Sequence, residues 1–166
     1  MRRALAPLLA AAILLAGCDA PQLSGIAAGL ETNMTAPQGP PINDPSEATF
    51  AFEPFPGIPG NVGDDLLRRI WQHAEREGLQ VVKRPGGTAR FTVEGTLTAV
   101  SNDTNSLIIY VFDIKDVTGR RLHRISGRQR SQESEGDPWS SIASGDLDVI
   151  ARRLVALINA WLHADA

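Results

Sequence analysis

Three strand-length segments joined by short turns fill the stretch from Ala89 to Ser131, and this stretch restricts the fold most. The segments read ARFTVEGTLTAV, SLIIYVFDIKD and RRLHRISGRQRS, separated by turn sequences at 101–105 and 117–119. Connections this short join antiparallel neighbours, because a parallel pair needs a crossover of a dozen or more residues. The sequence therefore predicts a three-stranded antiparallel meander.

Two further strands and a helix are predicted ahead of the meander. ATFAFE at 48–53 alternates as a strand does, and LQVVK at 79–83 is a second strand that ends at the turn Pro85-Gly86-Gly87. We expect the strands on either side of this turn to be antiparallel neighbours. Between the two strands, apolar residues recur at helical spacing at Val62, Leu66, Leu67, Ile70, Trp71 and Ala74.

The ends of the helices have recognisable signals. Asp64 and Asp65 are expected in the first turn of the first helix, and Gly78 at its C-terminal cap. Asp137 and Pro138 are expected to cap and begin a long C-terminal helix, interrupted at Gly145. The apolar face of this helix comprises Ile142, Leu147, Ile150, Ala151, Leu154, Val155, Ile158, Trp161 and Leu162.

These elements follow one another in the order β-α-β-β-β-β-α. The first strand, helix and second strand form a right-handed parallel crossover, and the three later strands extend the sheet. Each helix has one apolar stripe, so both cover the same face. The prediction is an α/β (α+β) two-layer sandwich: a mixed, mostly antiparallel five-stranded sheet with two helices on one face, in a single domain over residues 48–166.

The amino terminus has the pattern of a secretory signal peptide over residues 1–17. Arg2 and Arg3 precede an apolar run of about a dozen residues, which is shorter than the roughly 20 that span a bilayer. Leu15-Ala16-Gly17-Cys18 resembles the lipobox of bacterial lipoproteins, and Cys18 is the only cysteine. The resemblance implies cleavage before Cys18 and a stable membrane anchor through its acyl chains.

Residues 18–47 are rich in proline, glycine and small polar residues, which predicts a lipidated linker. As a coil it reaches roughly 30 Å, which keeps the domain close to the membrane. In some bacterial lipoproteins an acidic residue after the cysteine retains the protein in the inner membrane, and Asp19 favours that membrane slightly over the outer one. The expected location is the periplasmic side of the cell envelope.

The charge balance opposes nucleic acid binding. Loss of residues 1–17 removes Arg2 and Arg3 and leaves 14 basic against 19 acidic residues, a formal charge of −5. Nucleic acid binding depends on neutralising phosphates with an excess of Lys and Arg. We expect no nucleic acid partner.

Residues suited to catalysis are few, and no cofactor or metal is expected. His73, His123 and His163 form no ligand-spaced pair and are expected at the surface. GIPGNVGDD lacks the lysine of a phosphate loop, and no G-x-S-x-G turn is present. The carboxylates of Glu94, Asp113 and Asp116 could meet across strands, but nothing in the sequence supports such a pair. The sequence favours a noncatalytic protein.

Two surface features remain, and the first is a set of four arginines. Strand alternation places Arg120, Arg124, Arg128 and Arg130 on one face of the last strand, together with Leu122 and Ser126. This positive stripe is suited to an acidic protein, a glycan carboxylate or a lipid phosphate. The alternative is an edge strand that uses charge to prevent aggregation.

The second feature is an apolar strip. If Ile108, Tyr110, Phe112 and Ile114 face the helices, then Leu107, Ile109 and Val111 lie on the open face of the sheet. A solvated sheet face is usually polar, so this strip calls for a cover. The proline-rich linker is one candidate cover, and a partner protein or a second copy of the chain is the other.

The lipobox, the short linker and a small domain with DPWSSI ahead of a long helix resemble uncharacterised envelope lipoproteins of Gram-negative bacteria. In element order alone, the domain is similar to the LpoB regulators and the amino-terminal domain of TolB. The leading hypothesis is therefore a noncatalytic, lipid-anchored interaction module of an envelope complex; homo-oligomerisation is compatible with it. The alternative is a periplasmic binder of a small molecule or glycan at the Pro54 to Asn61 loop and the mouth of the helix that follows.

Overall fold

The computed structural model describes residues 40–42, 44–83, 87–101, 105–131 and 137–164. The predicted element order is confirmed, with one short 3₁₀ helix, η1, ahead of it. The elements are η1 (Pro45–Glu47), β1 (Thr49–Phe52), α2 (Gly60–Arg76), β2 (Gln80–Val81), β3 (Phe91–Ser101), β4 (Ser106–Asp116), β5 (Arg121–Ser131) and α3 (Ser144–Leu162).

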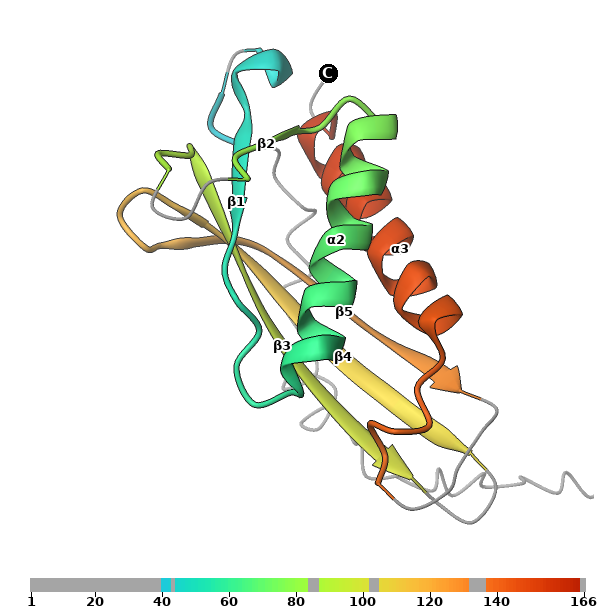
Figure 1. The fold of residues 1–166 in the computed structure, drawn as a ribbon. Helices are drawn as coiled ribbons and strands as arrows, with labels where there is room; N and C mark the ends of the chain where they lie inside the picture. Colours follow the sequence, from blue (N-terminus) through green and yellow to red (C-terminus); the bar gives the residue numbers. More distant parts are fainter. Residues whose placement is uncertain (1–39, 43, 84–86, 102–104, 132–136, 165–166) are drawn as a thin grey trace, which may run out of the picture. The chain divides into compact units, whose positions relative to one another are not determined.

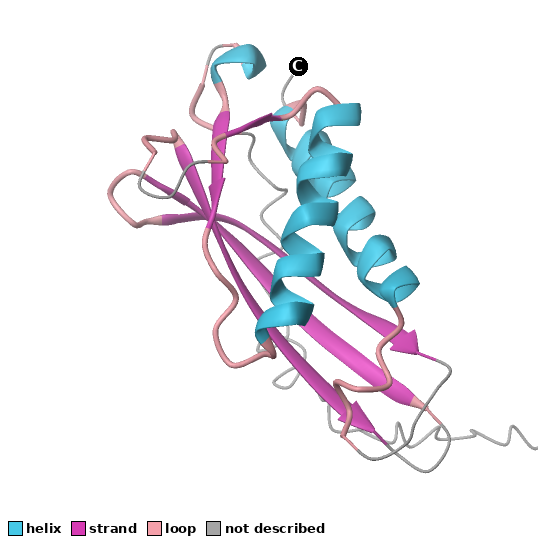
Figure 2. Cartoon of the chain, viewed as in Figure 1, coloured by secondary structure: helices cyan, strands magenta, loops and turns pink. Residues whose placement is uncertain are grey.

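The five strands form one mixed sheet in the order β2-β1-β3-β4-β5 (Figure 1). β1 is parallel to both of its neighbours, while β3, β4 and β5 form the predicted antiparallel meander. Both helices lie on the same side of this sheet (Figure 2). The α+β two-layer prediction is confirmed, and none of the described helices lies on the opposite face of the meander.

The expected pairing of the second and third strands is wrong. β2 and β3 both pair with β1, one on each side, and all three are parallel. β1 is the better neighbour for β3 because it brings aromatic residues opposite the apolar start of that strand: Phe50 is paired with Phe91, their ring centroids 5.3 Å apart. β2, which is only two residues long, remains at the outer edge.

Helix α2 begins earlier than predicted. Pro59 occupies the N-cap position, and its carbonyl accepts hydrogen bonds from the N–H groups of Val62 and Gly63. Asp64 and Asp65 therefore lie beyond the first turn, where Asp65 forms ion pairs with arginines on the next turn.

The other end of α2 is closed as expected. Gly78 has a φ of +72°, and Leu79 donates its N–H to the carbonyl of Ala74 at 2.8 Å. This six-residue closure is a Schellman motif, which needs a left-handed residue at the glycine position. It turns the chain from α2 directly into β2.

Helix α3 begins at Ser144 rather than at Pro138. The Asp137 carbonyl accepts hydrogen bonds from both the N–H and the hydroxyl of Ser140, which closes a turn instead of starting a helix. The Ser131 hydroxyl donates to the Ser141 carbonyl at 2.9 Å, and this hydrogen bond links the turn to the end of β5. Gly145 lies in the first turn of α3 and interrupts nothing.

The core lies between the helices and the sheet. As predicted, one alternating set of β4 side chains faces the helices, and Ile108, Tyr110, Phe112 and Ile114 are all buried. Tyr110 lies over Gly127 of β5, where any Cβ would collide with the phenol ring. Because Gly127 is directly opposite Tyr110 in the ladder, this contact fixes the register of β5 on β4.

Candidate functional site

The other alternating set of β4 side chains lies on the open face, in rows with the neighbouring strands. Leu107 lies between Val100 of β3 and Arg130 of β5, and Ile109 lies between Thr98 and Arg128. Val100 and Ile109 are each 45% exposed, which is high for large aliphatic residues. We call Val100, Leu107, Ile109 and Val111, with Arg128 and Arg130, the open-face site.

The structure brings three of the four predicted arginines to this face. Arg124, Arg128 and Arg130 are opposite Asp113, Ile109 and Leu107, and all three are exposed. Their predicted apolar neighbours Leu107, Ile109 and Val111 are also where the alternation placed them.

Arg120 is not part of the stripe, and this part of the prediction is wrong. The register shifts between Ile114 and Lys115, so that Leu122 is an extra residue in β5. Leu122 therefore packs against the core and does not lie on the arginine face. Arg121 is the residue opposite Lys115 in the β4–β5 ladder. Arg120 lies in the turn before the strand.

The Arg120 turn is held by its own ion pair. The Arg120 Nε donates to Asp116 Oδ2 at 3.1 Å, and the Thr118 hydroxyl donates to Asp116 Oδ1 at 2.5 Å. The hydrogen bond from Thr118, followed by those from Arg120, lowers the pKa of Asp116 to about 2. Asp116 and Arg120 thus stabilise the turn between β4 and β5.

Charges pair with one another at the end of the open face nearest this turn. Arg124 donates to both carboxylate oxygens of Asp113, at 2.6 and 2.7 Å, and Lys115 pairs with Glu94 at 2.5 Å. The hydrogen bonds from Arg124 hold the pKa of Asp113 below its usual value, and Asp113 in turn raises the pKa of Arg124. Glu94 and Asp113 therefore each have a basic partner, Lys115 and Arg124 respectively.

Arg128 and Arg130 differ from Arg124, because neither has an ion-pair partner in the part of the chain that the structure describes. Arg128 is directly opposite Ile109, the most exposed aliphatic residue of β4, and Arg130 is opposite Leu107 on the same face. The open face thus has one end at which the charges are paired. At its other end, two cations that have no ion-pair partner among the described residues lie beside aliphatic residues.

One of the three histidines is not at the surface as predicted. His73 is 6% exposed between the two helices, where its Nε2 donates to Asp148 of α3 at 2.9 Å. Arg69 also donates to Asp148, and this hydrogen-bonded pair lowers the pKa of the Asp148 carboxyl, with the His73 bond as the largest cause. The helical periodicity placed His73 on the polar face of α2. The prediction is wrong because the buried ring has a hydrogen-bond acceptor on α3.

The other two histidines also have structural neighbours. The His123 ring stacks on Trp161 with centroids 5.5 Å apart and planes at 6°, and burial lowers the pKa of His123. His163 lies just beyond the end of α3, next to the carbonyl of Asn159. Among the described residues no group of three or more His, Cys, Asp or Glu side chains is arranged to hold a metal ion.

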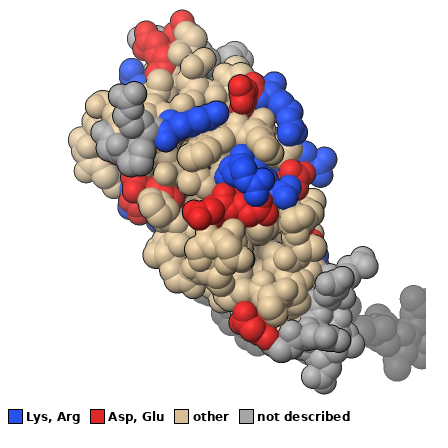
Figure 3. Space-filling view, viewed as in Figure 1, with Lys and Arg blue, Asp and Glu red and all other residues tan. Residues whose placement is uncertain are grey.

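The helix-covered side of the domain differs from the open face in its charge pattern. In Figure 3, positive and negative side chains are intermingled over the upper half of this side, and the lower half carries few charges. Among them, Asp65 pairs with Arg68 and Arg69 along α2. Neighbouring charges of opposite sign thus offset one another there.

The segment 54–61 of the predicted ligand site is divided among several parts of the fold. Phe55 is buried against the core, and Gly60 and Asn61 belong to the first turn of α2. Pro54 alone of this loop borders a cavity of about 330 Å³ that also touches Phe52 and Trp71. Sequence periodicity assigned Trp71 to the apolar face of the helix and gave no sign of this cavity.

Cys18 and the linker residues up to 39 lie outside the described residues, as does most of the predicted amino-terminal organisation. Within the described ranges, no helix has the length and apolar character needed to cross a bilayer. The predictions of lipidation at Cys18 and of a cleaved leader remain predictions.

The fold and the open-face site together define a small α+β protein in which the described helices cover one sheet face and leave the other open. No known protein family and no curated protein sequence matches the chain. Among solved structures, a PelC dodecamer from Paraburkholderia phytofirmans is similar at a TM-score of 0.50 and 17% identity, over 78% of this chain and 95% of that one. This likeness shows a shared fold.

Two weaker similarities have TM-scores below 0.5. Lipoprotein GNA1162 from Neisseria meningitidis matches at 0.39 and 15% identity, over 68% of this chain and 96% of that one. A PDZ domain protein from Parabacteroides distasonis matches at 0.43 and 16% identity, over 72% of this chain and 32% of that one. One structural neighbour of the chain is thus a bacterial lipoprotein.

Proposed function

We propose that this protein is a noncatalytic accessory protein of the bacterial cell envelope that docks a partner protein on the open face of its sheet. The observation that carries the proposal is the pairing of Ile109 with Arg128 in adjacent strands, both exposed and neither covered by another described element. Protein interfaces combine apolar centres with arginine in this way.

The chemistry of the face defines the partner. Val100 and Ile109 are suited to contact aliphatic side chains. The guanidinium groups of Arg128 and Arg130, which no described carboxylate contacts, are suited to bind carboxylates. The partner is therefore a protein surface on which aliphatic residues lie next to Asp or Glu. Arg124 contributes less, because Asp113 already occupies its guanidinium.

Protection of an edge strand explains these residues less well. Arginines along β5 alone would repel a second sheet edge. That role does not require exposed aliphatic residues on β3 and β4, which are interior strands of the sheet. Docking accounts for the cations and the apolar strip together.

The proposed anchor is the acylated Cys18, on the resemblance of Leu15 to Cys18 to a lipobox. Two or more acyl chains hold a protein on a membrane stably, whereas one chain binds reversibly. The domain then works within roughly 30 Å of the membrane surface. Mass spectrometry of the protein isolated from its own membranes tests this: an unmodified Cys18, or a retained leader, contradicts the anchor.

Site-specific photocrosslinking in intact cells tests the docking face. A photoreactive residue at position 109 should capture one partner, while the same residue at position 152, an exposed arginine of α3, should not capture it. The pair Arg128→Glu and Arg130→Glu should abolish the product, and Arg152→Glu should leave it intact. Equal capture from both positions contradicts the proposal.

A second copy of the chain is the other occupant to distinguish, since the structurally similar PelC crystal is a dodecamer. A crosslinked product that contains only this chain would replace the partner protein with self-association. A product that contains a second protein with an acidic, aliphatic surface supports the proposal as stated.

A further inference from the structure

Trp71 has an unusual polar atom. Among the described residues, its indole Nε1 is the one buried side-chain nitrogen or oxygen that has no hydrogen-bond partner. A buried donor without an acceptor costs free energy, so each such group calls for an explanation. Buried tryptophan N–H groups usually find a partner, which points to an acceptor for Trp71 outside the part of the chain that the structure describes.

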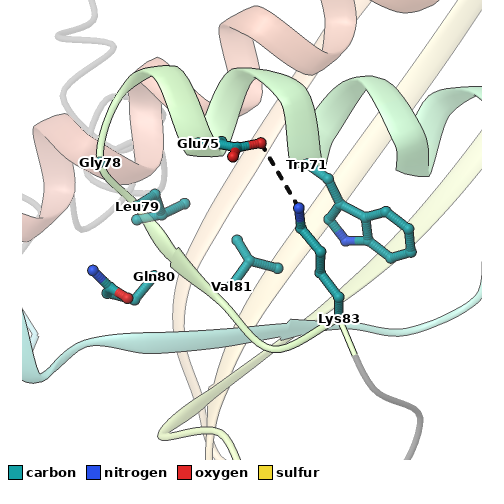
Figure 4. Close-up of a pocket in the computed structure, with 7 residues that line it drawn as sticks. All are labelled: Trp71, Glu75, Gly78, Leu79, Gln80, Val81 and Lys83. Atoms are coloured by element: carbon teal, nitrogen blue, oxygen red, sulfur yellow. Dashed lines mark ion pairs between the residues drawn. The ribbon is translucent and has the colours of Figure 1, made fainter.

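Trp71 lies on α2 beside two cavities, and Lys83 borders both of them as well. One cavity of about 250 Å³ lies between Trp71, Glu75 and β2 (Figure 4). The other, of about 330 Å³, lies against Phe52 and Leu67 at the edge of β1. β2 ends at Val81, so on that side of β1 no described strand pairs with Phe52.

The larger cavity, of about 330 Å³, is of a size that suits a small ligand. Binding pockets for small molecules begin at roughly 300 Å³ and combine apolar walls with a few polar groups. Phe52, Leu67 and Trp71 provide the walls here, and Glu53, Lys83 and Thr92 provide polar groups. The nitrogen-bearing edge of the Trp71 ring lies on the side of Lys83 in Figure 4.

Among the described residues, the Lys83 side chain is held only by a long, exposed ion pair. Its ammonium group contacts Glu75 at 3.8 Å, and the two side chains are 53% and 78% exposed. Exposed ion pairs of this kind contribute little to stability. A ligand can therefore displace Lys83 at low cost and reach the indole N–H behind it.

The charges around the cavities favour an uncharged ligand. Glu53 and Glu75 would repel an anion, and Lys83 would repel a cation. A sugar ring matches the arrangement better, because its hydroxyl groups both donate to carboxylates and accept from N–H groups. Its C–H groups also suit the electron-rich face of an indole.

We propose that Trp71 and Lys83 form a binding site for a neutral pyranose sugar, in which a sugar oxygen accepts the Trp71 indole hydrogen bond. Phe52 and Leu67 contact the apolar side of the ring, and Glu53 and Lys83 bind hydroxyl groups. This site uses α2 and the edge formed by β1 and β2, so it is independent of the open-face site.

Nuclear magnetic resonance of the isotope-labelled indole N–H groups tests the proposal. The chain has three tryptophans, so Trp71→Phe assigns its signal by disappearance. The purified protein is titrated with three neutral trisaccharides: maltotriose, cellotriose and triacetylchitotriose. Trigalacturonate and the unacetylated glucosamine trimer are the charged counterparts. The Trp71 signal should shift with at least one neutral sugar, while the Trp139 and Trp161 signals stay in place.

The variants sharpen the test. Trp71→Phe keeps an aromatic wall but has no N–H, so sugar affinity should fall by about tenfold, as expected for one lost hydrogen bond. Trp139→Phe is the matched control and should bind as the unaltered protein does. The Arg128→Glu and Arg130→Glu pair should also leave sugar binding unchanged, which separates this site from the docking face.

Two results would overturn the proposal. One is a Trp71 signal that none of the neutral sugars moves at millimolar concentration. The other is a shift produced by the charged trimers alone, which would assign the site to a different class of ligand. Both results come from the unaltered protein, so neither depends on whether a variant folds.

Discussion

Replacing Gly127 by alanine tests the strand register that creates the open face. A Cβ at position 127 would collide with the hydroxyl end of the Tyr110 ring. Tyr110 is 1% exposed, so its ring lies within the core and a shift would disturb its buried neighbours. Overpacking of this kind costs about 1 to 3 kcal/mol. For a domain of about 120 residues, that corresponds to a fall in Tm of roughly 4 to 12 °C.

A second substitution identifies the cause. Tyr110→Phe removes the nearest colliding atom, so the double variant should recover part of the stability lost in Gly127→Ala. Tyr110→Phe alone loses only the long hydrogen bond from Arg153, at 3.3 Å. Gly145→Ala serves as the control, since its Cβ would meet nothing within 4 Å.

Urea unfolding followed by circular dichroism measures these differences. If Gly127→Ala is as stable as the unaltered protein, then Tyr110 does not lie over position 127. β5 would then be displaced along β4, and a shift by one residue would move Arg128 and Arg130 to the core face. The open-face site would then not exist as described.

Three further predictions concern other parts of the fold. Asp116 has a pKa of about 2 against an ordinary 3.8, so its contribution to stability is present above about pH 4 and is lost as the pH falls toward 2. Asp113 and Asp148 are shifted in the same direction, and urea unfolding at pH 6 and pH 3 should show a loss that Asp116→Asn reduces. Gly78→Ala should destabilise the domain by about 1 to 2 kcal/mol, because a left-handed φ of +72° is costly for alanine, whereas Gly60→Ala should not. Asp148→Ala should cost about 1 kcal/mol in thermal unfolding, since it leaves the buried His73 without its acceptor; no change would mean that the α2–α3 hydrogen bond contributes nothing.

The parts of the fold that follow local periodicity could be predicted from the sequence. β4 has apolar residues in both alternating sets, so Ile109 had to lie on the face opposite Ile108 whichever set was buried. The apolar stripe of α2 likewise predicted its packing against the sheet. These features depend on side-chain spacing within one element.

The features that depend on contacts between elements could not be predicted in this way. The extra residue at Leu122 removed Arg120 from the open face, and no local signal marks that bulge. Strand β3 pairs with β1 instead of β2, a choice set by long-range aromatic packing. His73 is buried because Asp148, 75 residues away, accepts its hydrogen bond.

Arginine footprinting tests the docking proposal most directly. Phenylglyoxal modification of the protein in intact envelopes is compared with modification of the purified protein, and the reaction rate at each arginine is read by mass spectrometry. Arg128 and Arg130 should react several-fold more slowly in the envelope, while Arg152 on α3 should react at the same rate in both. Equal rates at all three arginines would contradict a partner on the open face.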